Sequence, residues 1–304
     1  MQLSSGTQLH LAQLNIGTLR HPIDHADTAA FVDGLAPVNA EADAAPGFVW
    51  RLQTEEGNAT SIHAFPDQLT IANLSVWQSI DDLRDFIFRG VHRDFLRRRA
   101  DWFQPGSRAA MWWVPAGTVP TLAEALARLA FFERFGATAH AFGMADRFPT
   151  LVVVRTPLAD PIVAPMLARL DAELVDGTPE GGSNFMHIAA EHVEKGNGAF
   201  FVAHHDGVPR ACGAYRRIEG VPGAAEVKRM WADPEARGAK LGAATLATIE
   251  AAAIADGFTE LRLETGEHFT AAVGLYRTFG FTQCESWGEY AGVPFSYCMS
   301  KHLG

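Results

Sequence analysis

The chain has few cysteines, no long apolar run and no excess of basic charge. Its three cysteines, Cys212, Cys284 and Cys298, are odd in number and lack the spacing of metal ligands, so neither a disulfide framework nor a metal site is predicted. No stretch reaches the roughly 18 apolar residues that span a bilayer, so no membrane partner is expected. Residues 1–11 lack the basic and apolar regions of a secretory leader. We therefore expect a cytoplasmic protein with reduced thiols.

Acidic residues outnumber basic ones, which gives a formal net charge of −10. A large nucleic-acid footprint needs a basic face that neutralises phosphates, so nucleic acid is not an expected partner. The one basic run, from Arg93 to Arg99, is more typical of a solvated helix face than of a phosphate site. The charge balance is compatible with a small cationic acceptor.

Length and composition predict two domains. With 304 residues, of which 48% are hydrophobic, the chain can bury full cores at the usual roughly 100 to 200 residues per domain. Glycines and prolines interrupt the chain between Arg134 and Pro161, and a new strand begins at Leu151. We place the domain boundary in this stretch and predict domains over residues 1–147 and 148–304.

The second domain is predicted to alternate strands and helices. Asp206 and Gly207 separate two apolar runs and are typical of the tight turn of an antiparallel hairpin. Leu167, Leu170 and Leu174 recur at helical spacing. The predicted strands cover residues 150–155, 199–203, 210–217, 225–232 and 260–266, and the predicted helices cover 162–174, 186–193, about 243–255 and 270–279.

A glycine-bearing loop, Asp233-Pro-Glu-Ala-Arg-Gly-Ala-Lys-Leu-Gly242, joins a strand to an alanine-rich helix. Loop amides that open a helix form an anion site, and the positive end of the helix macrodipole favours a phosphate there. Glycines let the backbone approach such an anion closely. Taken alone, Gly238 and Gly242 are a weak signal, because a glycine before a helix is often only a turn.

A second signature strengthens the first. Leu275-Tyr276 with Gly280-Phe281 follows the strand at 260–266 and a helix. The two signatures, in this order and spacing, resemble those of the GNAT superfamily of acetyl-CoA-dependent N-acetyltransferases. The resemblance runs from Pro149 to the end of the chain. It implies a mixed, mostly antiparallel sheet flanked by helices, and an enzyme that transfers an acetyl group to the amine of a small molecule or peptide by direct attack on the thioester.

The same resemblance implies where acetyl-CoA, the acyl donor substrate, would bind. The backbone of Met230, Trp231 and Ala232 would pair with the pantetheine arm as an added strand. Lys240 stands where the family usually has its middle glycine, which we expect to be tolerated if Lys240 keeps a negative φ. Phe269 stands where many members carry an asparagine, so no side-chain amide is assigned there. The residues implied for the pyrophosphate are Arg237, Gly238, Ala239, Lys240, Leu241, Gly242 and Ala243.

Transfer to an amine needs one group that takes a proton from the amine and one that protonates the leaving thiolate. The resemblance implies Tyr276 as the acid. Glu226 is our first candidate base, since a period of two places it on the strand face of Lys228 and Met230. Glu226 could equally be a strand carboxylate paired to Lys228. Glu264 and a water relay are the alternatives for the base.

Acceptor specificity is expected from two segments of the second domain. These are the weakly patterned stretch 175–196 and the tail 287–297, whose aromatic residues would wall an acceptor pocket or simply cover the open end of the sheet. Cover is the more common outcome. The tail aromatics are Trp287, Tyr290, Phe295 and Tyr297.

The first domain reads as an α+β, ferredoxin-like unit. A long amphipathic helix is predicted over 79–102, and Thr121 is predicted to cap a second helix that reaches Glu133. A further helix separates the first two strands. The predicted strands cover residues 9–19, 48–53, 69–76 and 108–115.

Four stretches of the first half, at 91–95, 102–103, 112–115 and 139–144, resemble an uncharacterised bacterial domain family of the dimeric α+β barrel type. The resemblance implies an α+β barrel domain that forms a homodimer. Relatives by fold include small monooxygenases and haem-binding proteins, so His92 with Trp102, Trp112 and Trp113 is a candidate ligand pocket. The favoured interpretation is that the tryptophans are core residues, because fold alone does not establish a ligand.

Two alternatives to a simple acetyltransferase therefore stay open. One is a sensor that binds coenzyme A without turnover, for which Lys240 and Phe269 leave room. The other is a bifunctional chain whose first domain resembles a monooxygenase or binds haem. Tyr276 favours the enzyme, and the sequence contains no dedicated motif for a redox cofactor.

Overall fold

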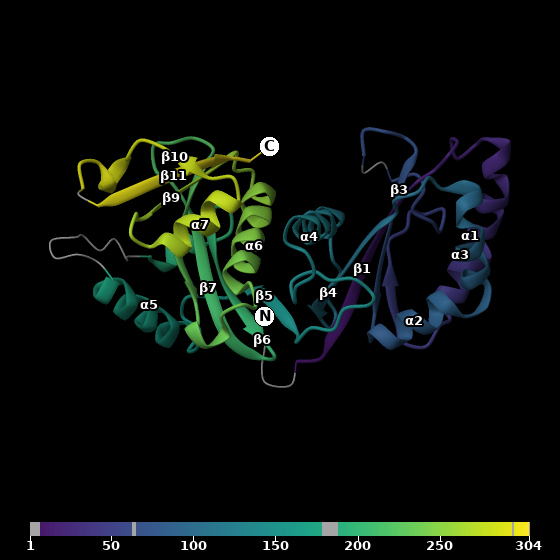
Figure 1. Ribbon diagram of the computed structural model, residues 1–304, viewed down its shortest axis with the longest axis horizontal. Helices are drawn as coiled ribbons and strands as arrows, with labels where there is room; N and C mark the ends of the chain where they lie inside the picture. The colour runs from purple at the N-terminus through teal and green to yellow at the C-terminus, as the bar shows by residue number, and fades with distance from the viewer. Residues whose placement is uncertain (1–6, 63–64, 178–187, 294, 304) are drawn as a thin grey trace. The chain divides into compact units, whose positions relative to one another are not determined.

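The computed structural model describes residues 7–62, 65–177, 188–293 and 295–303 (Figure 1). Contacts divide these residues into an N-terminal unit that ends at Thr150 and a C-terminal unit that begins at Leu151. Within the described ranges, no helix is long and apolar enough to cross a bilayer.

The N-terminal unit is built on a four-stranded sheet in the order β2-β3-β1-β4. All neighbouring pairs are antiparallel, and β1 faces β3 from Leu11 opposite Trp77 to Thr18 opposite Thr70. Helices connect β1 to β2 and β3 to β4, so the connectivity is the predicted ferredoxin-like one. The strands are β1 (Leu9–Thr18), β2 (Phe48–Arg51), β3 (Thr70–Trp77) and β4 (Arg108–Pro115).

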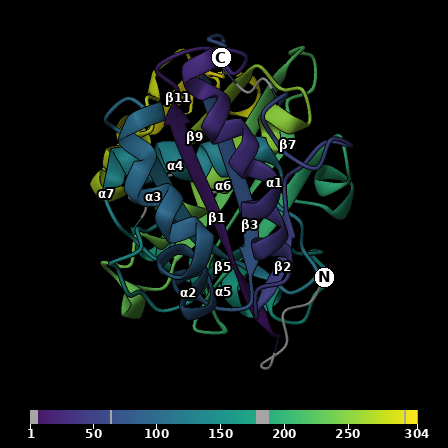
Figure 2. The same ribbon diagram turned by 90° about the vertical axis from the view of Figure 1, so that its right-hand side faces the viewer.

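Helices cover both faces of this sheet because successive β1 side chains point to opposite sides. On one face, Leu14 packs with Leu129 of α4 (Leu122–Phe135). On the other face, Leu19 packs with Phe31 of α1. Figure 2 shows α1 and α3 side by side in front of β1 and β3. The helices on that face are α1 (Ala29–Asp43), α2 (Ile80–Phe88) and α3 (Gly90–Trp102).

The single helix predicted over 79–102 is wrong, since the structure has two helices there. Arg89 is extended, with φ −122° and ψ 170°, and Gly90 has φ 58°, so the chain turns between α2 and α3. The apolar residues keep their helical spacing across this break, so the periodicity of the sequence did not reveal it. The predicted cap at Thr121 is confirmed, because its side chain accepts a hydrogen bond from the Glu124 N–H.

The structure separates the residues of the candidate ligand pocket in the first domain. Trp102, Trp112 and Trp113 belong to three different apolar clusters, on both faces of the sheet. The Nδ1 atom of His92 lies 3.1 Å from the carbonyl oxygen of Ile87, and burial lowers the pKa of His92. This arrangement supports the core interpretation of the tryptophans.

The C-terminal unit is built on a seven-stranded sheet in the order β10-β11-β9-β8-β7-β6-β5. Among the described strands, β8 and β9 form the only parallel pair, which confirms the predicted mixed, mostly antiparallel sheet. The strands are β5 (Leu151–Arg155), β6 (Gly198–His205), β7 (Val208–Arg217), β8 (Ala224–Ala232), β9 (Glu260–Gly266), β10 (Thr282–Gln283) and β11 (Ser296–His302).

Helices also cover both faces of the second sheet (Figure 1). The helix α6 (Leu241–Ala255) packs on β6, β7 and β8. On the opposite face, Leu170 of α5 (Val163–Gly177) buries against Trp231. The third helix, α7 (Thr270–Thr278), directly follows β9.

The predicted hairpin is confirmed, since Asp206 (φ 50°) and Gly207 (φ 75°) form the turn between β6 and β7. The predicted helix over 186–193 is a short 3-10 turn, Ala190–Val193, in its described part, and residues 186–187 lie outside that part. The strand β11 was not predicted. It pairs antiparallel with β9, and the mixed polarity of its sequence gave no clear period.

Candidate active site

The centre of the C-terminal sheet opens where β8 and β9 part. Their parallel pairing runs from Ala224 opposite Glu260 to Val227 opposite Leu263 and ends there. On its other edge, β8 shifts register against β7 at a bulge, where Arg229 has φ 59°. A bulge bends a strand, so β8 turns away from β9 and exposes the edge of its last residues.

Because of the bulge, the predicted strand face is wrong for Met230. Lys228 does share the face of Glu226, with Nζ 3.4 Å from Oε1. Met230 does not, because its side chain lies over Gly213 beside Thr245 of α6, on the opposite face. The period of two fails across the extra residue of the bulge.

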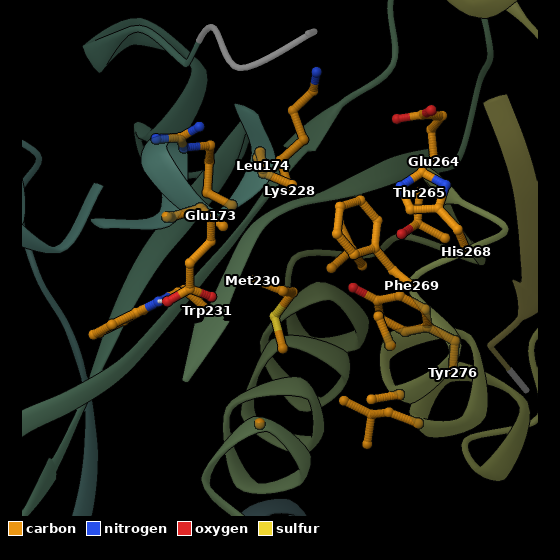
Figure 3. Close-up of a pocket in the computed structure, with 18 of the residues that line it drawn as sticks. Glu173, Leu174, Lys228, Met230, Trp231, Glu264, Thr265, His268, Phe269 and Tyr276 are labelled. Carbon is orange, nitrogen blue, oxygen red and sulfur yellow. Dashed lines mark hydrogen bonds between the residues drawn. The ribbon is translucent and has the colours of Figure 1, made fainter. Parts of the chain in front are cut away.

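A cavity of about 610 Å³ occupies the opening between the two strands. Figure 3 shows Tyr276 and Phe269 on one side of it, Met230 facing them, and Glu264 at one end. The predicted coenzyme A residues divide into two groups. Met230, Trp231, Ala232, Arg237 and Gly242 are among the residues that line the cavity, whereas Gly238, Ala239, Lys240, Leu241 and Ala243 are not.

The loop before α6 is anchored by Asp233, which is 4% exposed. Its Oδ2 accepts a hydrogen bond from Arg210 at 2.6 Å, and its Oδ1 accepts one from the Glu235 N–H at 3.0 Å. The bond from Arg210 lowers the pKa of Asp233. The carboxylate therefore fixes the start of the loop by two independent contacts.

Lys240 does not keep the negative φ that was expected. It caps α6 in the left-handed region, with φ 58° and ψ 27°, and its side chain is exposed. This conformation costs a residue with a Cβ about 1 kcal/mol. The first helical hydrogen bond runs from the Ala244 N–H to the Lys240 oxygen at 2.9 Å. The preceding amides of Leu241, Gly242 and Ala243 are the orphan donors that every helix start presents to an anion.

Tyr276 is 6% exposed and packs edge-on against Phe281, with ring centroids 5.9 Å apart. Its hydroxyl has no hydrogen-bond partner within the described part of the chain. Burial and then the charge of Glu264 raise the pKa of Tyr276. The phenol is therefore held in its protonated form at the cavity wall.

Glu226 is 2% exposed and engaged on both oxygens. Its Oε2 accepts from Arg216 Nε at 2.7 Å, and its Oε1 accepts from the Tyr290 hydroxyl and lies 3.4 Å from Lys228 Nζ. Glu289 joins the same cluster, with Oε1 2.9 Å from Arg216 and 3.3 Å from Lys228. The structure thus realises the ion-pair alternative for Glu226.

Glu264 has fewer polar partners than Glu226. It is half-buried at the cavity wall, and its Oε1 accepts a hydrogen bond from Ser296 Oγ at 2.9 Å. Burial raises the pKa of Glu264, although the bond from Ser296 acts against the shift. The sequence named Glu264 as the second candidate base and gave no signal for Ser296, which comes from the unpredicted strand β11.

The two segments that were expected to form the acceptor pocket contribute unequally to the lining of the cavity. Tyr290 and Phe295 line the cavity, whereas Trp287 packs edge-on against Tyr290 with ring centroids 5.3 Å apart. The hydroxyl of Tyr297 lies 3.1 Å from Arg277 NH2, outside the lining. In the stretch 175–196, residues 178–187 lie outside the described part of the chain. The helix α5, just before this stretch, also lines the cavity. Its Glu173 Oε1 accepts a hydrogen bond from Trp231 Nε1 at 2.9 Å (Figure 3).

A parted parallel strand pair, orphan amides at the start of the next helix and a buried tyrosine across the cavity define an acyltransferase site. Residues 169–281 match the family model described as "Acetyltransferase (GNAT) family", and residues 10–156 match "Domain of unknown function (DUF3291)". The chain is 35% identical over 156 residues to the "IAA acetyltransferase" of Azospirillum brasilense, an alignment of 51% of this chain and 99% of that protein. Through its C-terminal unit, the chain belongs to the GNAT family and is an acetyltransferase.

The chain is also similar to two further proteins. The chain is 34% identical over 90 residues to an uncharacterized N-acetyltransferase of Schizosaccharomyces pombe, covering 29% of this chain and 55% of that protein. A solved acetyltransferase of the GNAT family from Staphylococcus aureus covers 51% of this chain and 100% of its own, at 14% identity and a TM-score of 0.42.

Proposed function

We propose that the C-terminal unit transfers an acetyl group from acetyl-CoA to the amine of a small molecule or peptide. The observation that carries this proposal is the position of Tyr276, a buried residue whose hydroxyl has no hydrogen-bond partner among the described residues and which lines the cavity between β8 and β9. The GNAT family membership supplies the donor, since this family uses acetyl-CoA.

The residues around the cavity fit this donor substrate. The unpaired edge of β8 from Met230 to Ala232 offers backbone groups to an amide-bearing arm, as an added strand would. The orphan amides of residues 241–243, with the Arg237 side chain at the cavity, offer donors and charge to a pyrophosphate.

The proposed reaction is a direct displacement. The acceptor nitrogen attacks the thioester carbonyl carbon, the carbon–sulfur bond breaks, and the sulfur takes a proton from the Tyr276 hydroxyl. The nitrogen loses a proton to a base, for which we propose Glu264 instead of Glu226. The three donors around Glu226 occupy its oxygens, whereas Glu264 has one hydrogen bond and a pKa raised by burial.

The binding step is tested by titrating the purified full chain with acetyl-CoA and repeating the titration with Gly242→Asp. Gly242 lines the cavity, and a Cβ there would lie 3.5 Å from Leu275, which is ordinary contact. The added carboxylate repels the pyrophosphate, so we expect at least tenfold weaker binding. A variant that binds as tightly as the parent would place the donor elsewhere.

The transfer step is tested by thiol release from acetyl-CoA against a panel of amines. IAA is tested beside this panel as a separate acceptor, because the relative from Azospirillum brasilense carries that name. Turnover with at least one amine, and its loss on Gly242→Asp, is the expected result. A chain that binds acetyl-CoA tightly and releases no thiol with any amine would instead match the coenzyme-A sensor.

A further inference from the structure

The turn between β1 and α1 brings two imidazoles and a carboxylate together. His21 Nε2 lies 3.6 Å and His25 Nδ1 lies 3.7 Å from the same oxygen, Asp27 Oδ2. One ligand atom from each of the three residues lies within 4.8 Å of the others, and the two rings are stacked with centroids 4.5 Å apart. We propose that this cluster binds a divalent transition-metal ion, and specifically Zn²⁺.

The separations match what Zn²⁺ requires. At bond lengths of about 2.0–2.2 Å, a tetrahedral ion holds neighbouring nitrogen and oxygen ligands roughly 3.3–3.5 Å apart. The two observed nitrogen–oxygen separations, 3.6 Å and 3.7 Å, exceed this by a few tenths of an ångström. Rotation of the exposed side chains is needed to complete the site, because an ion lies in the plane of each imidazole that binds it and the two rings are stacked.

The backbone that carries the three ligands is already fixed. Arg20 donates its N–H to the Trp102 oxygen at 2.8 Å, which ties the start of the turn to the end of α3. His25 donates to the Pro22 oxygen at 3.0 Å, and Thr28 donates to the His25 oxygen at 2.9 Å. Thr28 is 2% exposed. Little conformational freedom is left for the metal to remove, which favours binding.

The donor set selects the class of metal. Imidazole nitrogen suits zinc, copper and nickel, whereas magnesium and calcium prefer oxygen ligands. The three side chains are 45%, 46% and 68% exposed, so an ion can enter from solvent and water can fill the fourth position. The His-x3-His half of the cluster is a common zinc spacing, and it was missed in the sequence because no cysteine accompanies it.

One existing bond competes with the metal. His25 Nδ1 accepts a hydrogen bond from the Asp27 N–H at 3.2 Å, which caps the first turn before α1. The metal would replace this contact, which is at the long end of the usual range, by a coordinate bond from the same lone pair. Without a metal, the cluster is a capped turn with two surface histidine–carboxylate pairs, worth little to stability. The two interpretations differ in their response to Zn²⁺.

The test is calorimetric titration of the untagged full chain with ZnCl₂ after chelator treatment. We expect one ion bound at this cluster, and at least tenfold weaker binding in both His21→Gln and Asp27→Asn. The matched control is Asp24→Asn, which removes the same charge from the same exposed turn outside the cluster and leaves binding unchanged. Circular dichroism in chelator verifies that the variants are folded.

Cobalt gives a second readout. Co²⁺ in a low-coordinate site has intense visible absorption, and we expect this band in the parent and in Asp24→Asn, but not in Asp27→Asn. A parent that binds no Zn²⁺, or an Asp27→Asn variant that binds it as tightly as Asp24→Asn, would overturn the proposal. Neither outcome bears on acetyl transfer, which is assigned to the other unit.

Discussion

The hydroxyl of Tyr290 donates a hydrogen bond to Glu226 Oε1, which joins the segment before β11 to the central strand β8. Both residues are 2% exposed, and Arg216 and Lys228 complete the cluster. The cluster thus holds the tail of the chain over the point where β8 leaves β9.

The Tyr290→Phe substitution is expected to destabilise the C-terminal unit by about 2 kcal/mol, because a buried carboxylate loses a hydrogen bond. Equilibrium unfolding in urea measures the change. The matched control, Tyr297→Phe, removes a hydroxyl that pairs with Arg277 outside the cluster, and we expect a smaller loss. Equal losses in the two variants would mean that the hydrogen bond to Glu226 contributes no more to stability than the contact with Arg277.

The Glu226→Gln substitution is expected to cost more, about 3 kcal/mol, since it leaves Arg216 and Lys228 without their central counter-charge. Acetyl transfer by the folded fraction is expected to persist, because Glu226 is a structural anchor in this account. Thermal melting and thiol release on the same preparation measure the two effects. Loss of turnover in a variant that melts with the parent would return Glu226 to the role of base.

The Glu264→Gln substitution is expected to separate stability from activity. Burial raises the folded-state pKa of Glu264, so the folded state binds its proton more tightly than the unfolded state does. Folding stability therefore falls as pH rises from the unfolded to the folded pKa, and stays lower above it. At neutral pH the variant is expected to melt at a higher temperature than the parent, and its turnover is expected to fall by at least tenfold.

The pH dependence of turnover is a second test of Glu264 as the base. In the parent, kcat/KM rises with pH through the raised pKa of the Glu264 carboxyl, because the base acts in its ionised form. The Glu264→Gln variant loses this limb of the profile. A variant that retains both the limb and full turnover would exclude Glu264 as the base.

The Gly213→Ala substitution is expected to disturb the proposed acetyl-CoA site by displacing Met230. A Cβ at Gly213 would lie 2.4 Å from Met230 Sδ, closer than real contacts allow, and at a tight 3.0 Å from Thr245 Cγ2. Displacement of Met230 is expected to raise the KM for acetyl-CoA and to cost about 1–3 kcal/mol of stability. The control is Gly274→Ala in α7, where a Cβ meets nothing within 4 Å, and which we expect to be neutral or stabilising. Initial-rate kinetics and melting distinguish them.

The Lys240→Gly substitution is expected to stabilise the chain by up to about 1 kcal/mol, because glycine adopts φ 58° without steric cost. Lys240→Ala keeps the left-handed strain and serves as the control. Urea unfolding of the pair measures the difference. A glycine variant no more stable than the alanine variant would contradict the left-handed assignment.

Local signals in the sequence were sufficient for part of this structure. Asp206-Gly207 predicted the β6–β7 turn, and the loop from Asp233 to Gly242 predicted the strand-to-helix junction, because both depend on neighbouring residues alone. The bulge at Arg229, the break at Gly90 and the φ of Lys240 interrupt otherwise regular patterns, and tertiary packing decides them. Lys228 was the expected partner of Glu226, whereas Arg216 on β7 and Tyr290 before β11 were not, so the ion-pair role could not be chosen over the role of base in advance.

Some expectations remain predictions. A homodimer through the N-terminal unit and a cytoplasmic location rest on resemblance and composition, and light scattering at micromolar concentration tests the first. In the N-terminal unit, helices of the same chain already cover both sheet faces. A dimer would therefore use helix surfaces or the edges of the sheet.

We propose that Tyr276 protonates the leaving thiolate, and the rate of the Tyr276→Phe variant is the decisive measurement of this role. The substitution removes one hydroxyl and keeps the ring that packs on Phe281. The measurement is kcat and KM for acetyl-CoA by thiol release, with any amine that the parent accepts. We expect kcat to fall about 10²–10⁴-fold, with KM changed little. A variant with the kcat of the parent would contradict it.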